Sequence, residues 1–435
     1  MKTICTAVAL LCLASSGLAQ LDEYWNVTPN DVNNLLKSMK GKMDADYTME
    51  IKSLAEVSPD PETNPILYRS GHYNFTYTAA EREKLREYLL AGGMIIYNTG
   101  LGSMPFYRSV KRELALIFPE QPLQRLSSDH PIFHAFHDVD RVEYCEGVRK
   151  AGYKGNEPWF DGIEINCRVV ALVSRWGMAV GWEGVVEESY QAYQPESAFK
   201  LGVNIFSYAS AMRAWAQNVA QAMKFVDEDA GTTDKVTMAQ VVYDGVWRTR
   251  HAGLSVLLQT FNRKTDIPVK FGLRELRLSD ADIFNAPVLY LTGHEYFELS
   301  GKEMTMLREY LASGGFLFAE ACCGRKGFDL AFRRIMKQVF PSSPLQRIAP
   351  NNSLFRIPND VRTVGVTPTL AADLGKNATT PRLEGVDMEG HFAVIYSPLG
   401  LAGGWEMSQS PYARGCNAAG SLQIGQNVLM YAVTQ

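Results

Sequence analysis

Apolar and polar positions follow one another in blocks that predict alternating strands and helices. The pattern is clearest in Pro287–Pro344, where a short apolar run, Val288–Leu291, precedes an amphipathic segment, Ser300–Ala312. A Gly-Gly turn then leads into a second apolar run, Phe316–Ala321, which ends at two cysteines. Strand, helix and strand in this order form a βαβ unit, so the stretch predicts a parallel sheet covered by helices.

The same periodicities predict the remaining elements of the second half. Alternation of β-branched and polar residues indicates strands, and apolar residues three or four apart indicate helices. We expect strands at Val236–Tyr243, Val269–Leu276 and His391–Ser397, and helices at His251–Lys264, Asp329–Val339 and Ser421–Val433.

The first half of the chain repeats the motifs of the second half in the same order. Pro65–His72 reads PILYRSGH where Pro287–His294 reads PVLYLTGH, and the sequence LREYL begins at both Leu85 and Leu307. A repeat of this length is too long for a solenoid unit and indicates two copies of one domain. We therefore expect copy one at residues 20–226, a polar linker at 227–235, and copy two at 236–435.

Residues 1–19 have the pattern of a signal peptide. Lys2 supplies a positive start, Ile4–Ala14 an apolar core, and Gly17–Ala19 a small-residue cleavage site. We expect an exported protein, periplasmic or secreted after cleavage near Ala19, with no later segment long enough to span a membrane. The counterpart of the first strand of copy two falls on residues 14 to 21, so the cleaved first domain should lack that strand.

Composition narrows the classes of partner. The formal net charge is −4, without a basic run, which argues against nucleic acid as a partner and leaves an unknown small ligand or protein. No motif indicates a cofactor or a metal site; the histidines between His130 and His137 read as a loop that packs on the sheet. Outside the leader the cysteines are few and odd in number, and Cys145 with Cys167 is a plausible disulfide.

The turn after Phe316–Ala321 has the shape of a nucleophile elbow. Such a turn lifts one side chain above the sheet, and Cys322 is placed for this role, with His294 or His391 as the candidate base. The alternative is that Cys322 and Cys323 are small residues that fill a tight turn. Copy one reads Gly-Leu-Gly at the matching place, so thiol chemistry is confined to copy two.

Other polar residues near the predicted strand ends are candidates for ligand binding or for purely structural roles. His72 and His294 could contact a ligand or cap their own turns. Arg325 and Lys326, near a helix start, could hold an anion or form a solvated helix face. Trp405 and Glu406 could bind a sugar, or could be a packed ring and a turn cap.

Copy two resembles the bacterial domain-of-unknown-function family 4159, whose members look like class I glutamine amidotransferase domains. The motifs that carry the resemblance are LYLTGH ending at His294, LREYLASGG ending at Gly315, CGRKGFD beginning at Cys323, and GWE ending at Glu406. The resemblance implies two tandem flavodoxin-like α/β domains with mainly parallel sheets.

The chain also departs from the pattern of a working amidotransferase. Such an enzyme would have Gly-x-Cys-x-Gly where this chain has Glu-Ala-Cys-Cys-Gly, and His391 stands where relatives are expected to have an arginine, as copy one does at Arg168. The sequence thus leaves three functions open: a non-catalytic binding protein, a cysteine-dependent hydrolase or amidotransferase-like enzyme, and a carbohydrate-binding or processing protein.

Overall fold

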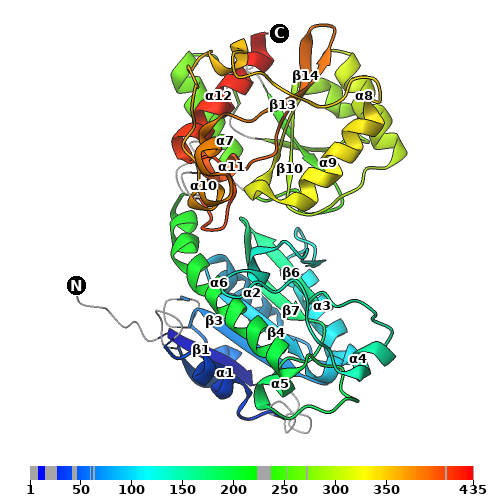
Figure 1. The fold of residues 1–435 in the computed structure, drawn as a ribbon, viewed down its shortest axis with the longest axis vertical. Coiled ribbons are helices and arrows are strands. Elements are labelled where there is room, and N and C mark those ends of the chain that lie inside the picture. Colours follow the sequence, from blue (N-terminus) through cyan, green and yellow to red (C-terminus); the bar gives the residue numbers. More distant parts are fainter. Residues whose placement is uncertain are drawn as a thin grey trace, which may run out of the picture. The chain divides into compact units, whose positions relative to one another are not determined.

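The computed structural model divides into two compact units, Met1–Ala220 and Gln221–Gln435. It describes residues 8–14, 27–41, 47–58, 60–61, 64–222, 237–250, 252–270, 273–406 and 409–434, and the predicted linker lies outside them. Each unit holds one seven-stranded sheet with helices packed against it (Figure 1). The predicted α/β fold with mainly parallel sheets is confirmed in both units.

In unit 2 the strands lie in the order β12-β13-β14-β11-β10-β8-β9. The five strands from β14 to β9 are parallel, whereas β13 and β12 run antiparallel to their neighbours. The carboxyl ends of the parallel strands therefore meet at one edge of the sheet. The strands are β8 (Met238–Val242), β9 (Arg274–Arg277), β10 (Val288–Gly293), β11 (Phe316–Ala321), β12 (Gln346–Arg347), β13 (Glu384–Met388) and β14 (His391–Ser397).

Unit 1 has the same topology, which agrees with the duplication read from the sequence. Its order is β5-β6-β7-β4-β3-β1-β2, again with five parallel strands and an antiparallel pair at one side. The strands are β1 (Val8–Ala14), β2 (Tyr47–Ser53), β3 (Ile66–Gly71), β4 (Met94–Thr99), β5 (Gln124–Arg125), β6 (Phe160–Ile165) and β7 (Arg168–Ser174).

Two apolar clusters sandwich the sheet of unit 2. One cluster joins it to α8 and α9 through residues such as Leu307 and Phe332; the other joins it to α7, α11 and α12 through Leu257, Trp405 and Val428. The helices of unit 2 are α7 (Gly253–Thr265), α8 (Gly301–Ala312), α9 (Lys326–Val339), α10 (Pro368–Leu374), α11 (Ala402–Trp405) and α12 (Ala418–Thr434). Those of unit 1 are α1 (Asp31–Met39), α2 (Ala79–Leu90), α3 (Met104–Ile117), α4 (Glu146–Lys150), α5 (Ala179–Glu183) and α6 (Pro195–Ala222).

Local sequence signals placed the central elements correctly. All six residues of β11 are buried, as expected for a strand covered on both faces. The Ser300 side chain accepts a hydrogen bond from the backbone of Glu303, and the Glu303 carboxylate accepts one from the backbone of Ser300, so α8 begins with a capping box. The second predicted strand, in contrast, is confined to Arg274–Arg277.

Strand β1 comes from the segment that the sequence assigns to the leader. It lies between β2 and β3 in the sheet. The repeat placed the first strand of copy one at residues 14 to 21, so β1 begins six residues earlier than predicted. Residues 15–26 are outside the described part. Cleavage near Ala19 would remove β1, and β3 would then become an edge strand. Export remains a prediction. Among the described helices, none combines the length and apolarity needed to cross a bilayer.

A buried acid at the start of α1 makes the stability of unit 1 depend on pH. Asp31 accepts hydrogen bonds from Thr28 and Tyr68, but burial outweighs them and raises the pKa of its carboxyl group to about 6. The folded state therefore binds a proton more tightly than the unfolded state does. The stability that this proton contributes is complete below about pH 4 and is lost as the pH rises through 6.

We predict that Asp31→Asn removes this pH dependence. The amide keeps the shape and stays neutral, so the variant should gain stability relative to the parent as the pH rises from 4 to 7.5, by up to about 3 kcal/mol. Urea unfolding of the full chain at both pH values measures the difference. An equal effect of the substitution at the two values would contradict the assignment.

Candidate functional site

The turn that follows β11 is a sharp elbow formed by Cys322–Gly324. Cys323 has φ 56° and ψ 13°, in the left-handed region, and Gly324 follows with φ 66°. Two neighbouring contacts hold this conformation. The Cys323 carbonyl accepts a hydrogen bond from the Arg414 backbone at 2.9 Å, and a Cβ added at Gly400 would lie 2.7 Å from the Cys323 nitrogen. The loop after β14 therefore needs a glycine to approach the elbow.

The elbow brings two thiols and an imidazole together. One ring nitrogen of His294 and the sulfur atoms of Cys322 and Cys323 all lie within 4.8 Å of one another, and the two sulfurs are 4.0 Å apart. His294 follows β10, whose last residue, Gly293, is level with Ala321 of the parallel strand β11. Parallel pairing therefore places the histidine beside the elbow. We call these three residues the thiol cluster.

Within the thiol cluster, Cys323 is the more accessible sulfur. Cys322 is 1% exposed and His294 is 2% exposed, whereas Cys323 is half-buried. Cys323 also occupies the position with positive φ in the turn. The sequence pattern favoured Cys322 as the nucleophile and gave Cys323 only the role of a small residue in the turn; the available signal was that Cys323 directly precedes Gly324.

An arginine that the sequence did not single out lies beside Cys323. Arg250 directs Nη2 toward the Cys323 sulfur at 4.0 Å and forms a buried ion pair with Glu406 at 3.1 Å. Glu406 also accepts hydrogen bonds from the backbone of Ala252 and Gly253, both at 3.0 Å. Glu406 therefore fixes the start of α7 and the position of Arg250, rather than facing a ligand directly.

Arg325 and Lys326, the two cations that the sequence offered for binding an anion, differ in their exposure. Arg325 is buried and pairs with Glu295 at 2.7 Å, so its charge is compensated within the fold. Lys326 is exposed in the first turn of α9. Of the two, only Lys326 keeps its side chain on the surface near the elbow.

Glu320 is a fully buried carboxylate two residues before the elbow. It accepts hydrogen bonds from Tyr290 Oη at 2.7 Å and from the backbone of Leu401 and Ala402 at the start of α11, the latter at 3.1 Å. Burial raises the pKa of the Glu320 carboxyl group despite these donors. This side chain joins β10, β11 and the loop after β14.

Unit 1 contains the same arrangement without the thiols. Its matching turn, Gly100–Gly102, also has a non-glycine residue at positive φ, Leu101 at 48°. Asn98 stands where unit 2 has Glu320 and likewise accepts a hydrogen bond from the loop after the neighbouring strand, from the Met178 backbone at 2.8 Å. The strained turn thus belongs to the fold, whereas Cys322 and Cys323 belong to unit 2 alone.

His72 occupies the place in unit 1 that His294 occupies in unit 2. A Cβ added at Gly100 would lie 2.4 Å from His72 Nε2, so the imidazole fills the space that a cysteine would need. Burial lowers the pKa of His72, which favours a neutral ring. His72 therefore packs against its own turn, where Gly100 and Leu101 stand in place of the two cysteines.

His391 lies at the opposite edge of the sheet from the thiol cluster. It begins β14, and Val394 of β14 is level with Leu317 of β11, so eight residue positions separate His391 from Cys322 along the strands. At 3.3 Å per residue this is roughly 26 Å. In unit 1 the matching Arg168 donates to the carbonyls of Leu89 and Gly93 at the end of α2, a structural role. The structure does not bring His391 to the thiols.

Trp405 and its unit 1 counterpart Trp182 are core residues. They are 0% and 1% exposed, and each indole nitrogen donates to a backbone carbonyl, that of Ser421 or Ala198 respectively. The sugar-binding interpretation of Trp405 is wrong, because a buried ring cannot stack on a sugar.

The predicted disulfide between Cys145 and Cys167 is also wrong. Cys145 is a free cysteine whose backbone nitrogen donates to Ala192, and Ala192 pairs with Gly177 just beyond the end of β7. Cys167 directly precedes β7. The seven residues of this strand hold the two cysteines roughly 23 Å apart, far beyond the reach of an S–S bond.

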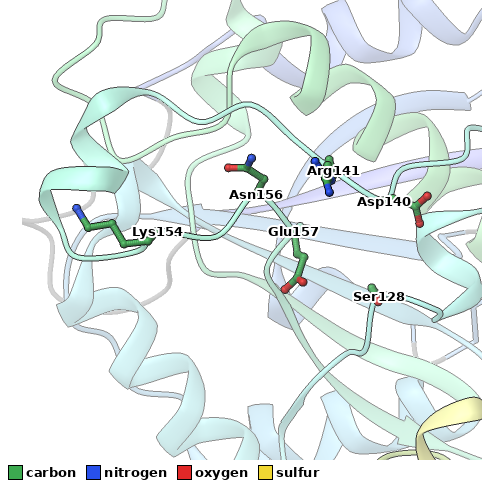
Figure 2. Close-up of a pocket in the computed structure, with 6 residues that line it drawn as sticks. All are labelled: Ser128, Asp140, Arg141, Lys154, Asn156 and Glu157. Atoms are coloured by element: carbon green, nitrogen blue, oxygen red, sulfur yellow. The ribbon is translucent and has the colours of Figure 1, made fainter.

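Unit 1 also has a shallow polar pocket of about 410 Å³ (Figure 2). Its walls combine two acids, two bases, an amide and a hydroxyl, all on exposed side chains. None of the residues singled out from the sequence lines it. The lining residues are Ser128, Asp140, Arg141, Lys154, Asn156 and Glu157.

Comparisons with known proteins give a family but no activity. The family described as domain of unknown function (DUF4159) matches residues 14–210 and again residues 237–433. No curated protein matches the chain. Among solved structures, a candidate phosphosugar isomerase from Silicibacter pomeroyi is 8% identical, with 73% of this chain and 75% of that chain covered and a TM-score of 0.18. A TM-score this low carries no functional argument.

We predict that Glu320→Ala destabilises unit 2. The substitution leaves the Tyr290 hydroxyl and two backbone donors without their buried acceptor, so the free energy of unfolding should fall by about 2–4 kcal/mol. Glu320→Gln retains one acceptor and should cost less than half as much.

Chemical denaturation of the full chain measures both variants, with Asn98→Ala as the matched change in unit 1. A Glu320→Ala variant as stable as the parent would show that this carboxylate does not hold the elbow.

Proposed function

Because the chain belongs to the DUF4159 family and carries its domain twice, we propose that the second copy alone is catalytic, as a cysteine-dependent hydrolase or amidotransferase-like enzyme. The observation that carries the proposal is the thiol cluster, in which an imidazole nitrogen lies within 4.8 Å of both sulfurs at the carboxyl edge of the sheet. Open α/β sheets bind their ligands at this edge. Catalytic hydrogen bonds in unliganded enzymes are often longer than in the substrate complex, so this separation is compatible with proton transfer.

Cys323 is the proposed nucleophile and His294 the proposed base. His294 accepts the proton of the Cys323 thiol, and the resulting thiolate then bonds to the carbonyl carbon of an amide. The C–N bond then breaks, and the proton on His294 passes to the departing amine. Water attacks the resulting thioester, which releases the carboxylic acid and restores the thiol.

Arg250 would support this chemistry electrostatically. A guanidinium beside a thiol stabilises the thiolate, and Arg250 Nη2 is 4.0 Å from the Cys323 sulfur. The buried pair with Glu406 holds the guanidinium in place without removing its donor toward the sulfur. Arg250 thus acts on the nucleophile, and Glu406 acts through Arg250.

Unit 1 is proposed to have no catalytic role. It retains the sheet, the elbow and His72, but Gly100 and Leu101 replace the cysteines. The second candidate function is a non-catalytic exported protein that binds a small ligand or protein partner at the strand ends. It is supported by unit 1, which keeps the elbow and the histidine although it has no thiol there. The reactivity of Cys323 separates the two candidates.

We predict that Cys323 is alkylated by iodoacetamide at pH 7 about 10-fold faster than a cysteine in an unstructured peptide. The rate should change little between pH 6 and 8, because an activated thiol is already ionised over this range, whereas the peptide rate rises with pH. Mass spectrometry of the full chain identifies the modified residue.

Two other thiols serve as internal controls. Burial raises the pKa of Cys145 to about 11 and that of Cys416 to about 12, so both should stay protonated and unreactive. Cys323→Ser should abolish the fast phase, and His294→Ala should restore the steep pH dependence of a simple thiol. A parent protein whose Cys323 reacts no faster than the peptide would leave the binding function as the better proposal.

A further inference from the structure

We propose that the thiol cluster is also a binding site for a thiophilic divalent cation, with Zn²⁺ as the best match. Cys322, Cys323 and His294 would be the three protein ligands, and a water or ligand atom would take the fourth position. This site goes beyond the proposed hydrolase, since it uses the sulfur atoms as ligands rather than as nucleophiles. It uses both thiols, whereas the reaction needs one.

The distances in the cluster are close to those of a formed site. Zinc binds cysteine sulfur at about 2.3 Å in a tetrahedral arrangement, which separates two sulfur ligands by roughly 3.8 Å. The sulfurs of Cys322 and Cys323 are 4.0 Å apart, and the His294 nitrogen lies within 4.8 Å of each. Sulfur and nitrogen ligands of a tetrahedral zinc ion are roughly 3.6 Å apart. Side-chain rotations that shorten the two sulfur–nitrogen separations by up to roughly 1.2 Å would therefore bring all three atoms onto one ion.

The elbow explains how adjacent residues can share one ion. In an extended strand, neighbouring side chains point to opposite faces of the sheet. Here the left-handed conformation of Cys323 reverses the chain within one residue and turns both sulfurs to the same side. The Gly400 contact and the Arg414 hydrogen bond hold this conformation, so the ligands are arranged before an ion arrives.

The charge of the cluster also suits a dication. In the complex both thiols are deprotonated, and two thiolates with a neutral imidazole cancel the charge of Zn²⁺. Cys322 and His294 are buried, where an uncompensated charge would be costly. The compensated complex is therefore compatible with a buried position next to the existing Arg250–Glu406 pair.

The repeat supplies a control within the same molecule. Unit 1 has His72 at the matching position but glycine and leucine in place of the cysteines. We therefore expect one zinc ion per chain, bound by unit 2. His72→Ala should leave zinc binding unchanged, whereas His294→Ala should weaken it.

Competition with a chromophoric zinc chelator, on reduced and metal-free full-length protein, tests the proposal. The parent should bind one equivalent of Zn²⁺. Cys322→Ser and Cys323→Ser should each lower the affinity by more than the roughly 10–100-fold that loss of an outer-shell partner costs. Cys416→Ser, at another buried cysteine of unit 2, is the control for general disturbance of the fold. Substitution with Co²⁺ should add thiolate-to-metal charge-transfer absorption.

The outcomes separate this inference from the proposed hydrolase. No zinc bound by the parent, or equal affinity in parent and Cys323→Ser, would overturn the metal site whatever the alkylation rate of the metal-free protein. If Cys322→Ser fails to fold, His294→Ala and Cys323→Ser still decide the question. Zn²⁺ should also protect Cys323 from iodoacetamide, and alkylation that continues at full rate with zinc present would contradict shared ligands.

Discussion

The buried carboxylate of Glu320 is the interaction on which the site of unit 2 depends. It joins the Tyr290 hydroxyl on β10 to the backbone at the start of α11, from a position two residues before the elbow. Burying an acid costs free energy, and the raised pKa of Glu320 reflects that cost. The donors around it offset the cost and fix the three segments that surround the thiol cluster.

Unit 1 shows how much of this arrangement the fold requires. Asn98 replaces Glu320 and accepts a hydrogen bond from the matching loop, and Leu101 keeps the positive φ of Cys323. The turn, the tie to the neighbouring loop and the histidine are therefore features of the domain. The thiols, Arg250 and the ion pair of Arg325 with Glu295 were added or retained in one copy. The residues that unit 2 has and unit 1 lacks at this turn include two thiols and an arginine, which are groups suited to chemistry.

Much of the fold could be predicted from local patterns. The apolar run of β11, the capping box at Ser300 and the repeated motifs all act over a few residues, so the sequence displays them directly. Local patterns could not decide whether His294 or His391 is the base that lies beside the thiols. Both begin or follow a strand, and only the parallel register of β10, β11 and β14 shows that one lies beside the elbow and the other at the far edge.

The sequence by itself determined the α/β class, the duplication, the elbow and the restriction of any thiol chemistry to the second copy, because these follow from periodicity and residue identity. Tertiary structure decided the rest. It placed Trp405 in the core, separated Cys145 from Cys167, and brought Arg250 to Cys323 across 73 residues of chain. It also turned two adjacent cysteines to one side beside His294. The sequence lists residue types, but backbone conformation and strand register are settled only when distant segments pack together.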